Sequence, residues 1–161
     1  MFICGNRYRC TGCRICETVC SFRHFSMISP SRARIQIKRD DLGADKIISC
    51  RQCDEPACVE ACPEDALWKG EQLVNFSRDL CTGCYSCIDA CPHNGIWSHP
   101  ELDYPLKCNL CNGNPLCVEM CPADVLKLVK SDEEAEAVWN EPSHGKDLIE
   151  AYLARRRDQN E

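Results

Sequence analysis

The sequence is short of aromatic residues, glycine and long apolar stretches, and each shortage excludes a class of protein. Aromatic residues make up 7% of the 161 residues, and the apolar fraction of 44% counts 17 cysteines, so little remains for an ordinary hydrophobic core. No stretch approaches the roughly 18 consecutive apolar residues of a membrane-spanning helix. No glycine-rich phosphate loop, nucleophile–base set or carboxylate pair can be recognised as a motif. We expect neither a membrane span nor a catalytic pocket in this chain.

The sequence also gives little support for a secreted disulfide protein or a nucleic-acid-binding protein. Residues 1–9 lack the apolar run that a secretory signal peptide needs. The 17 cysteines are an odd number, and many lie in Cys-x-x-Cys pairs where a disulfide would be strained. A net charge of −6 disfavours nucleic acid. We therefore expect reduced thiols and a cytoplasmic location, unless an exported partner carries the folded chain with it.

Cysteine is what the chain has in excess, and all but one of the cysteines fall into four runs of four. The runs at 10–20 and 81–91 are compact, with the spacing C-x2-C-x2-C-x3-C, and those at 50–62 and 108–121 have a longer gap before the third cysteine. The compact spacing followed by proline is that of bacterial ferredoxins, in which three thiolates of one loop bind a cubane iron–sulfur cluster. Four such runs predict four 4Fe–4S clusters.

The order compact, long, compact, long indicates an internal duplication. Cys-Thr-Gly-Cys opens both compact runs, and both long runs contain Pro-x-Cys-Val-Glu-x-Cys-Pro-x-Asp-x-Leu, at 56–67 and 115–126. We expect a short helix to begin at the fourth cysteine of each run and to end at an apolar residue five positions later. These apolar residues are Phe25, Leu67, Ile96 and Leu126. Trp68 and Trp97 follow two of them and are expected to pack in the core.

The predicted fold class is α+β, with ferredoxin-like two-cluster modules built from short strands and helices and followed by a helical C-terminal tail. Alternation predicts a strand over 33–38, with Ile35 and Ile37 on one face. This is the most basic part of the chain, either a solvated face or a docking surface. The tail after residue 131 is expected to form an acidic helix over 132–139 and then an amphipathic helix over 146–157. The amphipathic helix either packs on its own chain or docks on a partner.

The predicted cluster ligands are shared between runs. In two-cluster ferredoxins the fourth cysteine of a run binds the other cluster, so the second and third runs should exchange fourth ligands. The first and fourth runs remain and should pair in the same way. The predicted ligand sets are Cys50, Cys53, Cys58 and Cys91; Cys81, Cys84, Cys87 and Cys62; Cys10, Cys13, Cys16 and Cys121; and Cys108, Cys111, Cys117 and Cys20. The remaining Cys4 is expected to be a small buried residue or a free thiol.

Zinc is the alternative occupant, because soft thiolates select zinc and copper(I) as well as iron–sulfur clusters. Structural zinc sites usually join two Cys-x-x-Cys pairs across a long spacer, whereas here three cysteines share one short loop, which favours iron–sulfur clusters. Arg14, Arg51 and Lys107 adjoin predicted ligands and are expected to raise the potentials of their clusters. His93 is either a hydrogen-bond donor near a cluster or a surface residue.

The four-run constellation over residues 1–130 resembles the iron–sulfur electron-transfer subunits of the dimethyl-sulfoxide-reductase type. The resemblance implies an inner ferredoxin-like module at 50–99 inside an outer module formed by 1–49 and 100–130, with 131–161 as a helical extension. It implies a non-catalytic subunit that relays single electrons between a second redox partner and a tungsten or molybdenum enzyme, or a hydrogenase. In size the chain is similar to the small four-cluster subunits of tungsten aldehyde oxidoreductases and of the benzoyl-coenzyme-A-reductase type. A freely diffusing polyferredoxin is the alternative.

Overall fold

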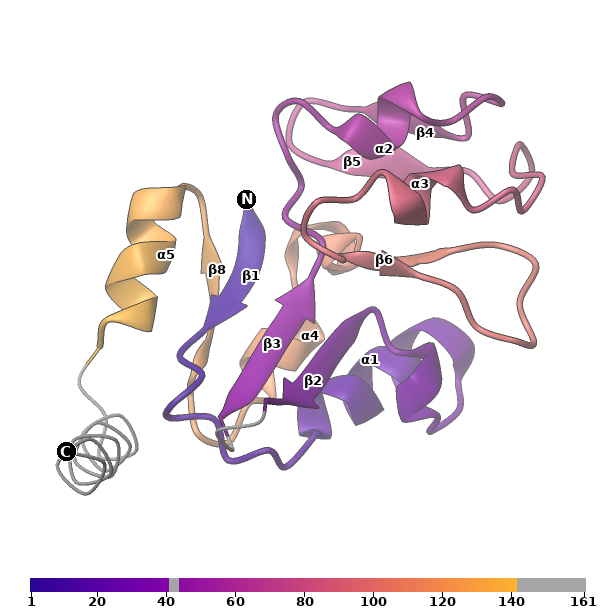
Figure 1. Cartoon of the computed structure of the whole chain (residues 1–161). Coiled ribbons are helices and arrows are strands. Elements are labelled where there is room, and N and C mark those ends of the chain that lie inside the picture. The colour runs from indigo at the N-terminus through magenta and orange to yellow at the C-terminus, as the bar shows by residue number, and fades with distance from the viewer. Residues whose placement is uncertain (41–43, 142–161) are drawn as a thin grey trace, which may run out of the picture.

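The strands of this protein pair two by two and do not join into a larger sheet in the described residues (Figure 1). A computed structural model describes residues 1–40 and 44–141. The antiparallel pairs are β1 (Phe2–Gly5) with β8 (Leu126–Val129), β2 (Ile35–Arg39) with β3 (Asp45–Ser49), β4 (Leu67–Lys69) with β5 (Val74–Phe76), and β6 (Ile96–Trp97) with β7 (Leu106–Lys107). Isolated two-stranded units are marginally stable in water, so these pairs depend on what they pack against.

The helices of the cysteine runs begin inside the runs, so the predicted helix starts are wrong for all four runs and the predicted helix ends are wrong for three. α2 (Ala57–Glu60), α3 (Ser86–Asp89) and α4 (Leu116–Glu119) each begin just before the third cysteine and end before the fourth. The Cys-Pro that follows cannot continue a helix, and a residue with φ near +50° comes three positions after the fourth cysteine. These residues are Asp65, Asn94 and Asp124. The chain therefore turns into a strand at the fifth position.

The first run differs because Ser21 stands where the other runs have proline. Without proline, α1 (Ile15–Phe25) continues through Cys20 for 11 residues and ends at Phe25, as predicted for this run. Two 3-10 turns, η1 (Pro30–Arg32) and η2 (Leu110–Gly113), complete the loops.

The strand registers follow the duplication seen in the sequence. Gly5 pairs with Leu126 and Cys4 with Lys127 in the first pair, and Phe76 pairs with Leu67 and Asn75 with Trp68 in the third. Alignment of Cys10 with Cys81 places Cys4 at the position of Asn75. In both cases, therefore, the strand before a compact run pairs in the same register with the strand after a long run.

Thiols form much of the core. One hydrophobic core combines isoleucines and leucines with Cys16, Cys20, Cys50, Cys108 and Cys117, and a second combines Leu67, Val74 and Ile96 with Cys58 and Cys87. Ile35 and Ile37 of β2 pack in the first hydrophobic core, which confirms the predicted strand. The prediction for Trp68 is wrong, because its side chain is 45% exposed. Leu67 occupies the inward face of β4, so the next residue points outward.

The last described helix, α5 (Asp132–Trp139), is held against β1 by Asn6, which is fully buried. Its side-chain amide nitrogen donates to the carbonyls of Val138 (3.2 Å) and Glu141 (2.9 Å). Its oxygen accepts from the backbone amides of Tyr8 (3.0 Å) and Arg9 (3.2 Å). The side chain of Asn6 thus forms hydrogen bonds both to the loop after β1 and to the C-terminal end of α5. The predicted helix over 146–157 lies outside the described residues.

Replacing Asn6 with alanine is expected to lower the free energy of unfolding by about 2 kcal/mol, because buried backbone groups lose their partners. Asn6→Asp keeps the acceptor for Tyr8 and Arg9 but places a buried carboxylate oxygen against the carbonyls of Val138 and Glu141. We expect both variants to loosen α5 from β1, with a fall in melting temperature at least as large for aspartate as for alanine. Equal melting temperatures for the wild type and both variants would contradict this role.

None of the helices in residues 1–40 and 44–141 has the length and apolar character needed to cross a bilayer.

Candidate iron–sulfur sites

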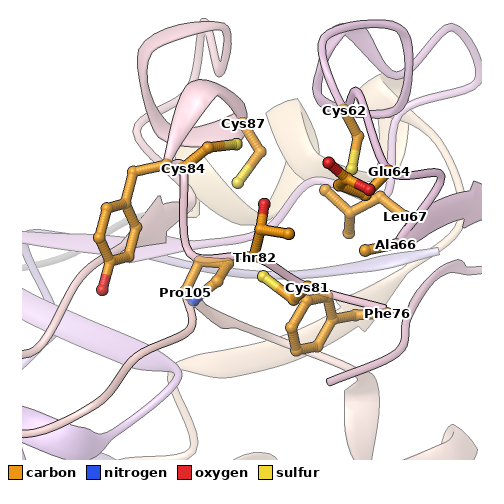
Figure 2. Close-up of a pocket in the computed structure, with 11 residues that line it drawn as sticks. Cys62, Glu64, Ala66, Leu67, Phe76, Cys81, Thr82, Cys84, Cys87 and Pro105 are labelled. Atoms are coloured by element: carbon orange, nitrogen blue, oxygen red, sulfur yellow. The ribbon is translucent and has the colours of Figure 1, made fainter. Parts of the chain in front are cut away.

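The second and third runs together line a cavity of about 20 Å³ (Figure 2). Its cysteines are Cys81, Cys84 and Cys87 of the third run and Cys62 of the second, which comes from a separate segment. Ala66, Leu67, Phe76 and Pro105 supply an apolar wall. We call this site 3, after the run that supplies three cysteines. It contains one of the predicted ligand sets.

Two further cavities have almost the same size and the same kind of lining. Site 1, of about 20 Å³, is lined by Cys10, Cys13, Cys16 and Cys121. Site 2, also of about 20 Å³, is lined by Cys50, Cys53, Cys58 and Cys91. In each case three cysteines come from one run and the fourth from another. Three cavities of equal size with equal thiol sets indicate three occupants of one kind.

The fourth set gathers where α1 packs against α4. Cys20 of α1 lies in the same hydrophobic core as Cys108 and Cys117. Burial raises the pKa of Cys117, and the neighbouring thiolates of Cys108, Cys20 and Cys111 raise it further. We call this group site 4. The structure thus brings every predicted set together, including the two that join the first and fourth runs.

The third cysteine of each run is buried and lies at the start of a helix. Burial raises the pKa of Cys16 and Cys87 to about 12 and that of Cys58 to about 11. A bare thiolate is therefore unfavourable at these positions, whereas a bound metal ion supplies the positive charge that keeps a coordinating thiol deprotonated. This property of the donor set fits an iron–sulfur cluster.

A left-handed residue two positions after the first cysteine shapes each loop. These residues are Gly12, Gln52, Gly83 and Leu110, with φ between 51° and 71°. The amide of this residue donates to the first cysteine sulfur in three runs, at 3.4 Å in each. The sequence signals this conformation only in the compact runs, through the glycine of Cys-Thr-Gly-Cys. Gln52 and Leu110 carry no such signal, because asparagine and glycine are the residues that usually adopt it.

The predicted cationic neighbours differ in their surroundings. Arg14 is exposed and lies 3.6 Å from the carboxylate of Glu17. Arg51 pairs with Asp132 and stacks on the ring of Phe2 at 4.1 Å. Lys107, in contrast, is only 5% exposed.

His24 is a neighbour of site 4 that the sequence did not single out. Its Nε2 atom lies 3.9 Å from the sulfur of Cys111. Burial, together with Arg34 and Arg23, lowers the pKa of His24 to about 4. His93, the histidine considered from the sequence, is exposed and bonds to no cysteine sulfur in the part of the chain that the structure describes.

Replacing His24 with phenylalanine is expected to lower the reduction potential of one cluster, at site 4, because an N–H donor to a ligand sulfur stabilises the reduced form. Phenylalanine keeps the ring and removes the donor. A potentiometric titration followed by electron paramagnetic resonance measures the change. His99→Phe, at a histidine that lines none of the three cavities, is the matched control and should leave all four potentials unchanged. Identical titrations for His24→Phe and the wild type would contradict the expectation.

Among residues 1–40 and 44–141, no three His, Cys, Asp or Glu side chains converge closely enough to hold a single metal ion. The cysteines surround cavities instead.

This arrangement of thiols around cavities defines a cluster-binding protein of the ferredoxin class. The chain matches the 4Fe-4S dicluster domain family twice, over residues 9–67 and over residues 47–131, and it belongs to that family. The two matches, with the grouped cysteines, give the chain four 4Fe–4S clusters.

The relatives are chains of oxidoreductases. A polyferredoxin-like subunit of aliphatic sulfonate oxidoreductase from Pyrococcus furiosus is 36% identical over 126 residues, covering 75% of this chain and 73% of that protein. A chain from Escherichia coli named as a probable anaerobic dimethyl sulfoxide reductase chain is 32% identical, covering 78% and 71%. The beta subunit of NADH-dependent phenylglyoxylate dehydrogenase from Aromatoleum evansii is 33% identical over 91% of this chain, which spans only 33% of its length. The resemblance to iron–sulfur subunits of the dimethyl-sulfoxide-reductase type is thus confirmed.

Among solved structures, the active-site complex BamBC of benzoyl coenzyme A reductase contains a chain with a TM-score of 0.47 and 24% identity. The match covers 95% of this chain and 96% of that one.

Proposed function

We propose that this chain is an electron-transfer subunit that relays single electrons between a catalytic oxidoreductase subunit and a second redox partner. The observation that carries the proposal is the assembly of four cysteine sets, three of them around cavities of about 20 Å³ each. Each bound cluster accepts and donates one electron. The protein itself holds the thiolates and excludes water around the third cysteine of each run. Its backbone amides donate to the sulfur of the first cysteine in three runs.

The proposed ligands are the sixteen cysteines of sites 1 to 4, in the sets predicted from the sequence. The proposed modules are nested: 50–99 forms the inner module, 1–49 with 100–130 the outer one, and 131–161 an extension. Pairing of β4 with β5 inside the inner module, and of β1 with β8 across the whole chain, supports this division. Cys4 belongs to no site and is buried in β1.

Electrostatic neighbours among the cysteines support the order 3, 2, 4, 1 along the relay. Cys87 of site 3 interacts with Cys58 of site 2, and Cys117 of site 4 with Cys16 of site 1. Between these pairs, Cys108 of site 4 interacts with Cys50 of site 2. Sites 3 and 1 are therefore the proposed ends, and each has an exposed cysteine, Cys84 and Cys13 respectively.

The proposed catalytic partner is a tungsten or molybdenum enzyme, as the confirmed family resemblance implies, with a hydrogenase as the next candidate. The names of the relatives place them in oxidoreductases of several substrates. The narrower proposal is a small subunit of a tungsten aldehyde oxidoreductase or of a benzoyl-coenzyme-A-reductase type enzyme. We propose the cytoplasm as its location.

Anaerobic purification of the tagged chain from its native source, with metal and sulfide analysis, tests this function. We expect about sixteen iron atoms per chain, an equal amount of acid-labile sulfide and a co-purifying subunit. Tungsten, molybdenum or nickel in that subunit would identify the enzyme class. A single monomeric brown species would instead establish a diffusing polyferredoxin, and a colourless chain with zinc and no sulfide would overturn the electron-transfer function.

A further inference from the structure

Lys107 is a buried cation at the end of β7, next to the first cysteine of site 4. Its side-chain nitrogen donates to three oxygens: the carbonyl of Val74 at 2.5 Å, the carbonyl of Cys108 at 3.1 Å and the side chain of Gln52 at 3.3 Å. These bonds use all three ammonium protons. They leave the positive charge itself uncompensated, because every acceptor is neutral.

In the described ranges 1–40 and 44–141, no carboxylate forms an ion pair with Lys107. Lys69 and Lys127, in contrast, are partly exposed and pair with Asp54 and Asp124. A buried ammonium without a counter-charge is strongly disfavoured, so its retention requires a nearby anion. The side chains around Lys107 supply none. An iron–sulfur cluster with four thiolates carries net negative charge and meets the requirement.

Lys107 lies between sites 2 and 4. Val74, which accepts its shortest bond, lines the cavity of site 2, and Gln52 stands between two cysteines of that site. Cys108, on the other side, opens site 4. One buried cation is therefore held by residues that belong to the segments of both sites.

Gln52 fixes this position. Its side-chain oxygen accepts from Lys107 and from the amide of Val74 at 2.9 Å, and its side-chain nitrogen donates to the carbonyl of Cys108 at 2.7 Å. It is 3% exposed. Because each of its polar atoms is engaged, the glutamine joins the segment of site 2 to that of site 4 and holds the ammonium between them.

The end sites have no equivalent cation. Site 3 is lined by Glu64 and by no lysine or arginine. Site 1 is lined by Arg14, which is exposed and already faces Glu17. An exposed, paired charge is screened by water and acts weakly on a neighbour.

We propose, resting on the electron-transfer function above, that Lys107, positioned by Gln52, raises the reduction potentials of both central clusters. A one-electron reduction adds a negative charge to an already anionic cluster, while the donor at one end of the relay loses that electron. A buried cation favours this added charge at low local dielectric. Electrons delivered to either end of the relay are therefore held preferentially by the clusters of sites 2 and 4, which have the higher reduction potentials. Lys107 is a positioning residue for charge and touches no substrate.

Redox titration of the purified four-cluster protein, followed by electron paramagnetic resonance, tests the proposal. Lys107→Gln removes the charge and keeps a donor, and Gln52→Glu adds an opposing charge with almost no change of shape. We expect each variant to lower two of the four midpoint potentials by at least 59 mV, which is a tenfold change in the equilibrium constant for one-electron reduction. Lys107→Arg should restore the wild-type values. Lys127→Gln, which removes a partly exposed lysine that is paired with Asp124 and lines none of the cavities, is the control and should shift little.

A shift in one cluster only, equal shifts in all four, or no shift would overturn the proposal. If Lys107→Gln fails to retain iron, Gln52→Glu decides the question, since it keeps the lysine and its bonds to the carbonyls of Val74 and Cys108. Wild-type protein with about sixteen irons and unchanged potentials in both variants would refute this inference and leave the relay intact. Wild-type protein without iron–sulfur clusters would refute the proposed function itself.

Discussion

Cys91→Ala is expected to empty the site of the second run, although Cys91 belongs to the third. The structure places Cys91 in the lining of site 2 with Cys50, Cys53 and Cys58, and Gly95 donates to its sulfur at 3.3 Å. Alanine removes the fourth ligand, so iron should fall from about sixteen to about twelve atoms per chain. Cys4→Ala is the matched control, because it also removes one thiol but Cys4 lies in none of the four sites. It should keep all of the iron.

Double variants show which cysteines share a cluster, because two ligands of one site act as a unit. Cys91→Ala with Cys53→Ala should keep about twelve irons, as either single variant does. Cys91→Ala with Cys84→Ala should keep only about eight, since sites 2 and 3 are both lost. If each run instead bound its own cluster, the two results would be exchanged. Iron and sulfide analysis of the four proteins is therefore decisive.

Gly83→Ala is expected to damage site 3 and to lower the free energy of unfolding by about 3 kcal/mol. Gly83 has φ of +71°, which alanine adopts only with strain, and it lies between Cys81 and Cys84. An added Cβ would also lie 2.6 Å from the backbone carbonyl oxygen of Asp103, which cannot move aside alone. The loop must therefore shift, and the two cysteines shift with it.

Gly12→Ala provides the comparison, since Gly12 occupies the same place in the other Cys-Thr-Gly-Cys. Its φ of +64° imposes similar strain, but the nearest atoms to an added Cβ belong to the side chains of Asp45 and Arg39. Side chains can rotate away, so we expect a loss nearer 1 kcal/mol and retention of the site 1 cluster. Thermal unfolding with iron analysis distinguishes the two variants. Equal losses would show that backbone strain alone decides the outcome.

Cysteine spacing made most of the candidate sites predictable. Ligand exchange between neighbouring runs follows from ferredoxin spacing, and the duplication extends it to the outer runs, so Cys20 and Cys121 could be assigned to sites far away in the sequence. The elements after the runs were predicted less well, because Leu67, Ile96 and Leu126, expected to end helices, begin strands.

Other features depend on contacts that spacing does not encode. The short helices begin just before the third cysteine because proline and a left-handed residue end them early. Trp68 is exposed because a two-stranded ribbon has one outer face. Burial of Lys107 beside Gln52 depends on residues 33 and 55 positions away in the chain, Val74 and Gln52. No local sequence pattern predicts these contacts of Lys107 with distant residues.

Pairing of β1 with β8 has a consequence for the order in which the protein is made. Cys91 emerges from the ribosome well before Cys121, so sites 2 and 3 have all their proposed ligands while site 1 still has three. β1 must also wait for residues 126–129 to gain its partner strand. Cluster insertion during synthesis would therefore proceed from the inside outward, and a chain released early would carry an inner pair of clusters without a complete path to the end at site 1.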